Sequence, residues 1–153
     1  MTQTKLTEQD KKLLLMDLCA RLPYGVMCDM GLKHPLQLQR ILVDKLDGNL
    51  LDFYEDGNDY QVYLSEVKPY LRSMSSMTKE ESIELQTILN DWWNKELFTL
   101  TEEPMIEYAL SSINYTLNPT LFDWLNKKHF DYRGLIKKGL AIKVTEENNP
   151  YKL

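Results

Sequence analysis

The chain has 153 residues, of which 43% are hydrophobic and 27% charged, so it can bury one ordinary core without disulfide or metal cross-links. A formal net charge of −5 argues against a protein that binds nucleic acid over its whole surface. No apolar run approaches the length of a membrane-spanning helix, and we therefore expect no membrane partner.

The charge is unevenly distributed along the chain. Residues 44–59 contain six acids and one lysine, and residues 79–107 contain eight acids and two lysines. Residues 119–144 reverse the sign, with six basic side chains against two acids. The sequence therefore predicts an acidic body with a basic C-terminal end.

The cysteines favour a reducing compartment. Cys19 and Cys28 both fall in apolar patterns typical of buried thiols, and no secretory leader pattern precedes them. We expect a cytoplasmic protein without a disulfide.

The N-terminal part predicts one helix. Thr7 followed three residues later by Asp10 is an acidic form of the capping box, and an apolar helical face follows it. The helix should run from about residue 8 to residue 20, because the proline in Leu22–Pro23 disfavours helical conformation in the residue before it.

Residues 25–72 predict the sheet region. Short β-prone runs alternate with turn residues, among which Asp47–Gly48 and Glu55–Asn58 mark hairpins. Arg40–Ile41 interrupts the alternation of the second run, which indicates a bulge, and Pro69 should end the region. We expect a small bent antiparallel sheet or an SH3-like barrel, with strands at 26–30, 36–43, 50–54 and 60–64.

Residues 78–139 predict the helical region. Thr78 to Glu81 is a full capping box that begins a helix over 79–95. Further helices are expected over 101–110, from Pro119 to about 128, and from an Asp131 cap to Gly139. Residues 140–144 predict a short final strand and residues 145–153 a flexible tail. The prediction is a single α+β domain over residues 1–144.

Three segments carry a family resemblance. Asp17 to Val26, Val67 to Thr78 and Asp123 to Ile136 together resemble a family of small uncharacterised proteins of gut anaerobic bacteria and of their phages or mobile elements. The resemblance implies a bacterial or phage cytoplasmic setting. It implies no activity, ligand or site residue.

Catalytic and metal signatures are incomplete. The sequence has no glycine-rich phosphate loop, nucleophile elbow, Cys-x-x-Cys or His-Glu-x-x-His pattern. Asp52, Asp56 and Gly57 match three positions of a calcium loop, but Tyr54 and Tyr63 occupy positions that need oxygen ligands. A hairpin turn explains them better. We expect no enzymatic activity and no cofactor.

The C-terminal segment offers the best candidate surface. His129, Asp131, Tyr132 and Arg133 could form an acid–base cluster, but capping, packing and ion pairing explain them more simply. Basic and aromatic side chains there could instead contact a partner, and Trp93 is a possible interaction anchor beside Trp92. The candidate interaction surface comprises Trp93, Lys127, Lys128, His129, Tyr132, Arg133 and Lys137.

Two functions follow from this surface. The leading hypothesis is a non-enzymatic accessory protein of phage or mobile-element type that binds another protein. The alternative is a nucleic-acid-binding module that uses the basic C-terminal edge. The sequence does not indicate an oligomeric state.

Overall fold

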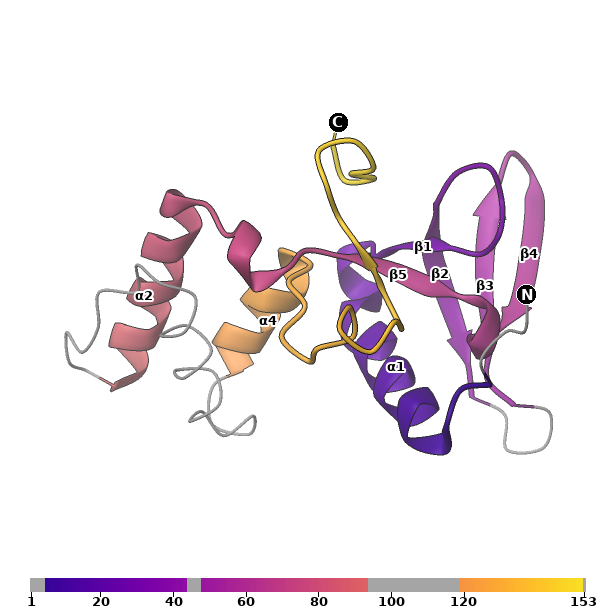
Figure 1. Ribbon diagram of the computed structural model, residues 1–153, viewed down its shortest axis with the longest axis horizontal. Helices are drawn as coiled ribbons and strands as arrows, with labels where there is room; N and C mark the ends of the chain where they lie inside the picture. Colours follow the sequence, from indigo (N-terminus) through magenta and orange to yellow (C-terminus); the bar gives the residue numbers. More distant parts are fainter. Residues whose placement is uncertain (1–4, 44–47, 94–118, 153) are drawn as a thin grey trace. The chain divides into compact units, whose positions relative to one another are not determined.

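The computed structural model describes residues 5–43, 48–93 and 119–152, with side chains described through residue 89 in the second range. The predicted α+β fold is confirmed: an N-terminal helix precedes a sheet, and helices and a short strand follow (Figure 1). The helices are α1 (Glu8–Arg21), α2 (Lys79–Trp93) and α4 (Pro119–Lys127). The strands are β1 (Met27–Asp29), β2 (Leu36–Leu42), β3 (Leu50–Glu55), β4 (Asn58–Tyr63), β5 (Lys68–Leu71) and β6 (Ile142–Lys143), and the 3₁₀ turns are η1 (Leu22–Tyr24), η2 (Leu64–Glu66) and η3 (Met74–Ser76).

The chain forms two compact units. Unit 1 comprises residues 1–71 and 133–153, and unit 2 comprises residues 72–132. Each has its own hydrophobic core, and no residue of one core cluster belongs to the other unit. That the chain is one folding domain stays a prediction.

The sheet of unit 1 has the strand order β4-β3-β2-β1-β5-β6. All neighbours are antiparallel except β5 and β6, which are parallel, and the ladder does not close into a barrel over the described residues. The predicted bulge is confirmed by a register shift between Leu38 and Arg40. The expectation that Pro69 ends the region is wrong, because Pro69 lies within β5 opposite Cys28. Strand β6 pairs with Tyr70 and Leu71 of β5. The β5–β6 ladder therefore does not need the backbone N–H that Pro69 lacks.

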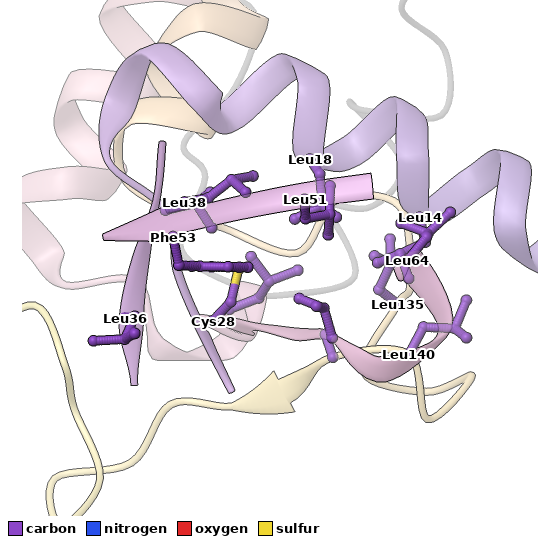
Figure 2. Packing of buried hydrophobic residues seen from close by; sticks show 14 residues of the cluster. Leu14, Leu18, Cys28, Leu36, Leu38, Leu51, Phe53, Leu64, Leu135 and Leu140 are labelled. Atoms are coloured by element: carbon purple, nitrogen blue, oxygen red, sulfur yellow. The ribbon is translucent and has the colours of Figure 1, made fainter. Parts of the chain in front are cut away.

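Helix α1 buries its apolar face against the sheet. The Thr7 hydroxyl accepts a hydrogen bond from the Asp10 N–H at 3.1 Å, as the capping pattern predicts. Leu14 and Leu18 then lie among buried side chains of the strands (Figure 2). Fully burying one leucine is worth about 1.5–3 kcal/mol, so this contact is a main source of the stability of unit 1. The labelled neighbours in the figure are Cys28, Leu36, Leu38, Leu51, Phe53, Leu64, Leu135 and Leu140.

The predicted helix from Asp131 to Gly139 is wrong. The Asp131 N–H donates to the Arg72 carbonyl at 2.8 Å, in extended backbone next to the Arg72–Phe130 bridge. Gly134 has φ +76°, which a right-handed helix cannot include. One helical turn remains, closed by Gly139 at φ +73°. There the Leu140 N–H donates to the Leu135 carbonyl and the Gly139 N–H to that of Ile136, at 2.9 and 3.0 Å, in a Schellman arrangement.

The segment predicted to be a flexible tail is part of unit 1 and is bonded to two of its strands. The Tyr151 hydroxyl donates to the Tyr70 carbonyl at 2.7 Å and accepts from the Met27 N–H at 3.1 Å. These bonds join the C-terminal segment to β1 and β5. Burial raises the pKa of Tyr151, which keeps the phenol protonated and able to donate.

Unit 2 packs α2 against α4. The capping box at Thr78 is confirmed: its hydroxyl accepts from the Glu81 N–H at 3.1 Å, and the Glu81 carboxylate accepts from the Thr78 N–H at 2.9 Å. The helix predicted from Pro119 is also confirmed, whereas the one predicted over 101–110 lies outside the described residues. The buried core comprises Met74, Leu85, Leu89, Leu121, Leu125 and Phe130.

Candidate interaction surface

The predicted C-terminal surface is divided between the two units. Lys127, Lys128, His129 and Tyr132 belong to unit 2, and Arg133 and Lys137 to unit 1. The side chain of Trp93 lies outside the described ones. Of the predicted surface, the structure therefore brings together only the residues at the end of α4 and directly after it, within unit 2.

Much of the charge at the end of α4 is neutralised. Lys128 Nζ lies 3.5 Å from Glu84 Oε2, and the Trp124 indole N–H donates to the same oxygen at 2.8 Å. The hydrogen bond from Trp124, followed by the charge of Lys128, lowers the pKa of Glu84 below its ordinary value. Lys127 and Lys137 remain exposed on their separate units. Lys138 and Lys143 of unit 1 are exposed as well, and the nucleic-acid alternative stays a prediction.

His129 has a structural role at the C-terminus of α4. It is 8% exposed and has φ +61°, a left-handed conformation that glycine usually supplies. Its N–H donates to the Asn126 carbonyl, and the Phe130 N–H to that of Leu125, at 3.1 and 3.0 Å. The His129 carbonyl accepts from the Arg72 N–H at 2.8 Å.

The other members of the predicted acid–base cluster are also engaged elsewhere. The Tyr132 hydroxyl donates to Asn126 Oδ1 at 2.9 Å within unit 2. Arg133 Nη1 donates to Asp17 Oδ1 at 2.8 Å within unit 1. These contacts point to structural roles for both side chains.

Asp17 is the centre of a buried charged cluster that the sequence analysis did not include. Arg21 donates to both of its oxygens, from Nε at 2.8 Å and from Nη2 at 3.0 Å. Arg133 adds a third bond, and the side chains of Asp17 and Arg21 are fully buried. An acid and an arginine four residues apart on the apolar face of α1 were a visible signal for half of this cluster. The position of Arg133 depends on tertiary structure.

The thiols are poor candidates for chemistry. Burial, and then the charge of Asp17, raise the pKa of the Cys28 thiol, which disfavours the nucleophilic thiolate. The expectation that both thiols are buried is wrong for Cys19, which is exposed on α1. Partial desolvation still raises the pKa of Cys19, and both cysteines are free.

The described residues offer neither a metal site nor a membrane span. In those ranges no group of three or more His, Cys, Asp or Glu side chains could hold a metal ion. No described helix is long and apolar enough to cross a bilayer. A hollow of about 500 Å³ opens beside the first turns of α1. Its lining comprises Glu8, Lys11, Lys12, Leu15, Gly48, Asn49, Tyr63, Leu64 and Ser65.

The outer face of β2, β3 and β4 carries a polar row and an apolar row. In the polar row Asp52 accepts from Arg40 at 2.6 Å and from Gln61 at 2.8 Å. The bond from Gln61 lowers the pKa of Asp52, and that of Arg40 adds to it, although burial opposes both. The apolar row comprises Leu42, Leu50 and Tyr63, which are cross-strand neighbours.

The apolar row and a second tyrosine are accessible. Leu42 is 37% exposed and Tyr63 is 52% exposed, while Tyr54 on β3 is 57% exposed. Exposed aromatic side chains beside aliphatic ones are typical anchors of protein interfaces.

Strand β4 forms one edge of the sheet (Figure 1). All six of its residues pair with β3, and no strand covers its other side among the described residues. The two strands are joined by Asp56 and Gly57, at φ +49° and +85°, which is the two-residue turn that positive φ angles permit. The predicted hairpin signal at Glu55–Asn58 is thus confirmed, and the calcium-like positions lie in this hairpin.

Among the described residues, Asp59 is the one charged side chain on the open edge of β4. Natural edges are commonly blocked by lysine, proline, a bulge or a covering segment. The strand has the sequence Asn-Asp-Tyr-Gln-Val-Tyr and pairs with β3 without a register shift. We define the β4 surface, which is distinct from the surface predicted from the sequence, as the open edge of β4 together with Tyr54 and the apolar row. The alternation of Tyr60 and Val62 revealed a strand, but its edge position depends on the strand order.

No protein-family model, curated protein or solved structure matches the chain. The family resemblance of the three sequence segments therefore stays a prediction.

Proposed function

We propose that this protein is a non-enzymatic interaction module that binds another protein through the β4 side of its sheet. The observation that supports this proposal most directly is the open, regular six-residue edge of β4. An open edge can accept an extended segment from a partner, because the main chain supplies hydrogen bonds regardless of side-chain identity. Exposed Tyr54 and Tyr63 provide adjacent contact area. The phage or mobile-element setting and the cytoplasmic location are part of this proposal and rest on the sequence resemblance and the cysteine pattern.

The test is site-specific photo-crosslinking in cells that carry the gene. A benzophenone amino acid replaces Tyr54 or Tyr63, and the matched control replaces Met16, which is 52% exposed on α1 of the same unit. We expect one discrete protein adduct from the two tyrosine positions and none from Met16. The partner, identified by mass spectrometry, must then bind the purified protein at a defined stoichiometry.

Two outcomes would overturn the proposal. Adducts of equal yield from Met16 and the tyrosines would mean non-specific capture. Copurifying nucleic acid that is lost at moderate salt, together with no protein adduct, would favour the nucleic-acid alternative.

A further inference from the structure

We propose that the partner of the β4 edge is an extended segment in which lysine or arginine alternates with apolar residues. This inference rests on the proposed function and specifies the chemistry of its ligand. Three features of β4 support it: the backbone groups at its open edge, its inner face and its outer face.

The backbone of β4 presents a short ladder to a partner. Residues that flank a two-residue hairpin turn form a hydrogen-bonded pair, and antiparallel pairs then alternate. Asn58, Tyr60 and Val62 therefore direct their backbone groups toward β3, while Asp59, Gln61 and Tyr63 direct theirs toward the open edge. The Tyr63 N–H supports this phase, because it donates outside the β3 ladder, to Glu66 Oε2 at 3.0 Å.

That bond also sets the end of the ladder. With the Tyr63 N–H occupied, Asp59 and Gln61 offer the complete N–H and C=O pairs. A partner needs about five residues in extended conformation to use both.

The inner face of β4 calls for apolar side chains. Tyr60 and Val62 are partly buried and pack against the hydrophobic core of unit 1. A segment added beside them places its inward side chains along the same core. Apolar residues there gain burial, whereas charged residues pay a desolvation cost.

The outer face calls for positive charge. Residues 50–66 contain five acids and no lysine or arginine. Arg40 bonds to Asp52 and His34 to Glu55, which leaves Asp56 and Asp59 as exposed acids on or beside the edge strand. A basic side chain opposite Asp59 forms a favourable cross-strand pair.

The same acidity disfavours a second copy of this chain as the partner. Pairing two β4 edges brings together two β3–β4 hairpins that each carry four acids without a lysine or arginine. Like charges facing each other across strands are destabilising. A basic segment of another protein fits the edge better.

The test uses synthetic peptides and the full-length protein. The probe is acetyl-Thr-Lys-Val-Lys-Val-Lys-Thr-amide with a fluorophore, measured by fluorescence anisotropy. A control peptide has glutamate in place of each lysine. Two further peptides are N-methylated, one at the lysines and one at the valines. Directly opposed antiparallel residues project their side chains to the same face, so the lysine N–H groups should face β4 and the valine N–H groups should face solvent.

Protein variants test the same contacts from the other side. Asp59→Lys should weaken binding roughly tenfold, by replacing attraction with repulsion. Gln61→Pro should abolish binding while the protein stays folded, because this N–H faces away from β3 and proline is tolerated at such edges. Glu147→Lys is the matched charge control, on an exposed residue of unit 1, and should bind like the wild type. Circular dichroism checks that each variant is folded.

The outcomes separate this inference from the proposed function. Binding of the lysine peptide and of the valine-methylated peptide, with loss for the glutamate and lysine-methylated peptides, supports the inference. Equal binding of the glutamate peptide overturns its charge requirement, and equal binding of the lysine-methylated peptide overturns strand addition. No peptide binding, or a dimer formed through β4, overturns the inference, while a protein adduct at Tyr63 would still support the interaction function.

Discussion

The carboxylate of Asp17 shows how much a single buried residue can organise. It accepts three hydrogen bonds, from Arg21 on the same helix and from Arg133 far along the chain. Each burial of a charge costs several kcal/mol, and close charge-assisted bonds offset this cost. Asp17 therefore holds the returning C-terminal segment against α1.

We predict that Asp17→Asn strongly destabilises unit 1. The amide keeps the shape but removes the charge that faces two guanidinium groups, and breaking a buried pair in this way costs about 3–5 kcal/mol. Hydrogen exchange of the α1 amides measures the loss of stability in unit 1. Tryptophan fluorescence would report on unit 2 instead, because the tryptophans at positions 92, 93 and 124 all lie there. Asp59→Asn, on an exposed side chain of the same unit, is the control and should change little. Similar protection of α1 in both variants would contradict this role of Asp17.

At the scale of elements, Arg72 and Glu81 join the start of α2 to the rest of unit 2. Arg72 donates to both Glu81 oxygens at 2.8 Å, and its guanidinium carbon lies 4.3 Å from the centre of the Phe130 ring. Burial opposes ionisation of Glu81, but the bonds from Arg72 and the Thr78 N–H outweigh it, so the pKa of Glu81 is lowered. The ionised form is thus the one that the fold stabilises.

We predict that this contact makes unit 2 sensitive to acid. A carboxyl whose pKa is lowered by folding stabilises the fold above its unfolded value of about 4.3. That stabilisation is lost as the pH falls through the pKa that the carboxyl has in the folded protein. Glu81→Gln should lower the free energy of unfolding by about 1–2 kcal/mol at pH 7, and the difference from wild type should shrink below about pH 4. Denaturation followed by tryptophan fluorescence measures it, and a difference that does not depend on pH would contradict the assignment.

Sequence patterns predicted elements where the cause is local. The caps at Thr7 and Thr78 and the turn at Asp56–Gly57 need only residues within a few positions, and each forms as expected. The segment after Asp131 did not form the predicted helix, because its N–H bonds to Arg72 and Gly134 has a positive φ.

Long-range pairing escaped the sequence analysis for a different reason. The strand around Pro69 is held by β1 and by β6, which lies about 70 positions later in the chain. Nothing in its local composition encodes that partner. The open edge of β4 was missed in the same way, because strand order is a property of the whole sheet.

At the scale of the whole molecule, unit 2 is inserted into the chain of unit 1. The chain leaves unit 1 after residue 71 and returns at residue 133, and each core is made by residues of its own unit. The insertion is closed at its base, because the Asp131 N–H donates to the Arg72 carbonyl at 2.8 Å. Domain insertion of this kind is tolerated where the two ends of the inserted segment lie close together.

We predict that unit 1 folds without unit 2. Joining residues 1–72 to 131–153 through a linker of about four Gly and Ser residues spans the short gap between Arg72 and Asp131. The product keeps the whole core, including Leu135 and Leu140, and should protect the amides of α1 and the central strands from exchange. Residues 1–72 alone are the matched control and should remain unfolded, because they lack those leucines, β6, Arg133 and Tyr151. If the joined chain is as unprotected as the control, the two units form one folding domain, as the sequence predicts, and the interaction edge depends on unit 2 for its stability.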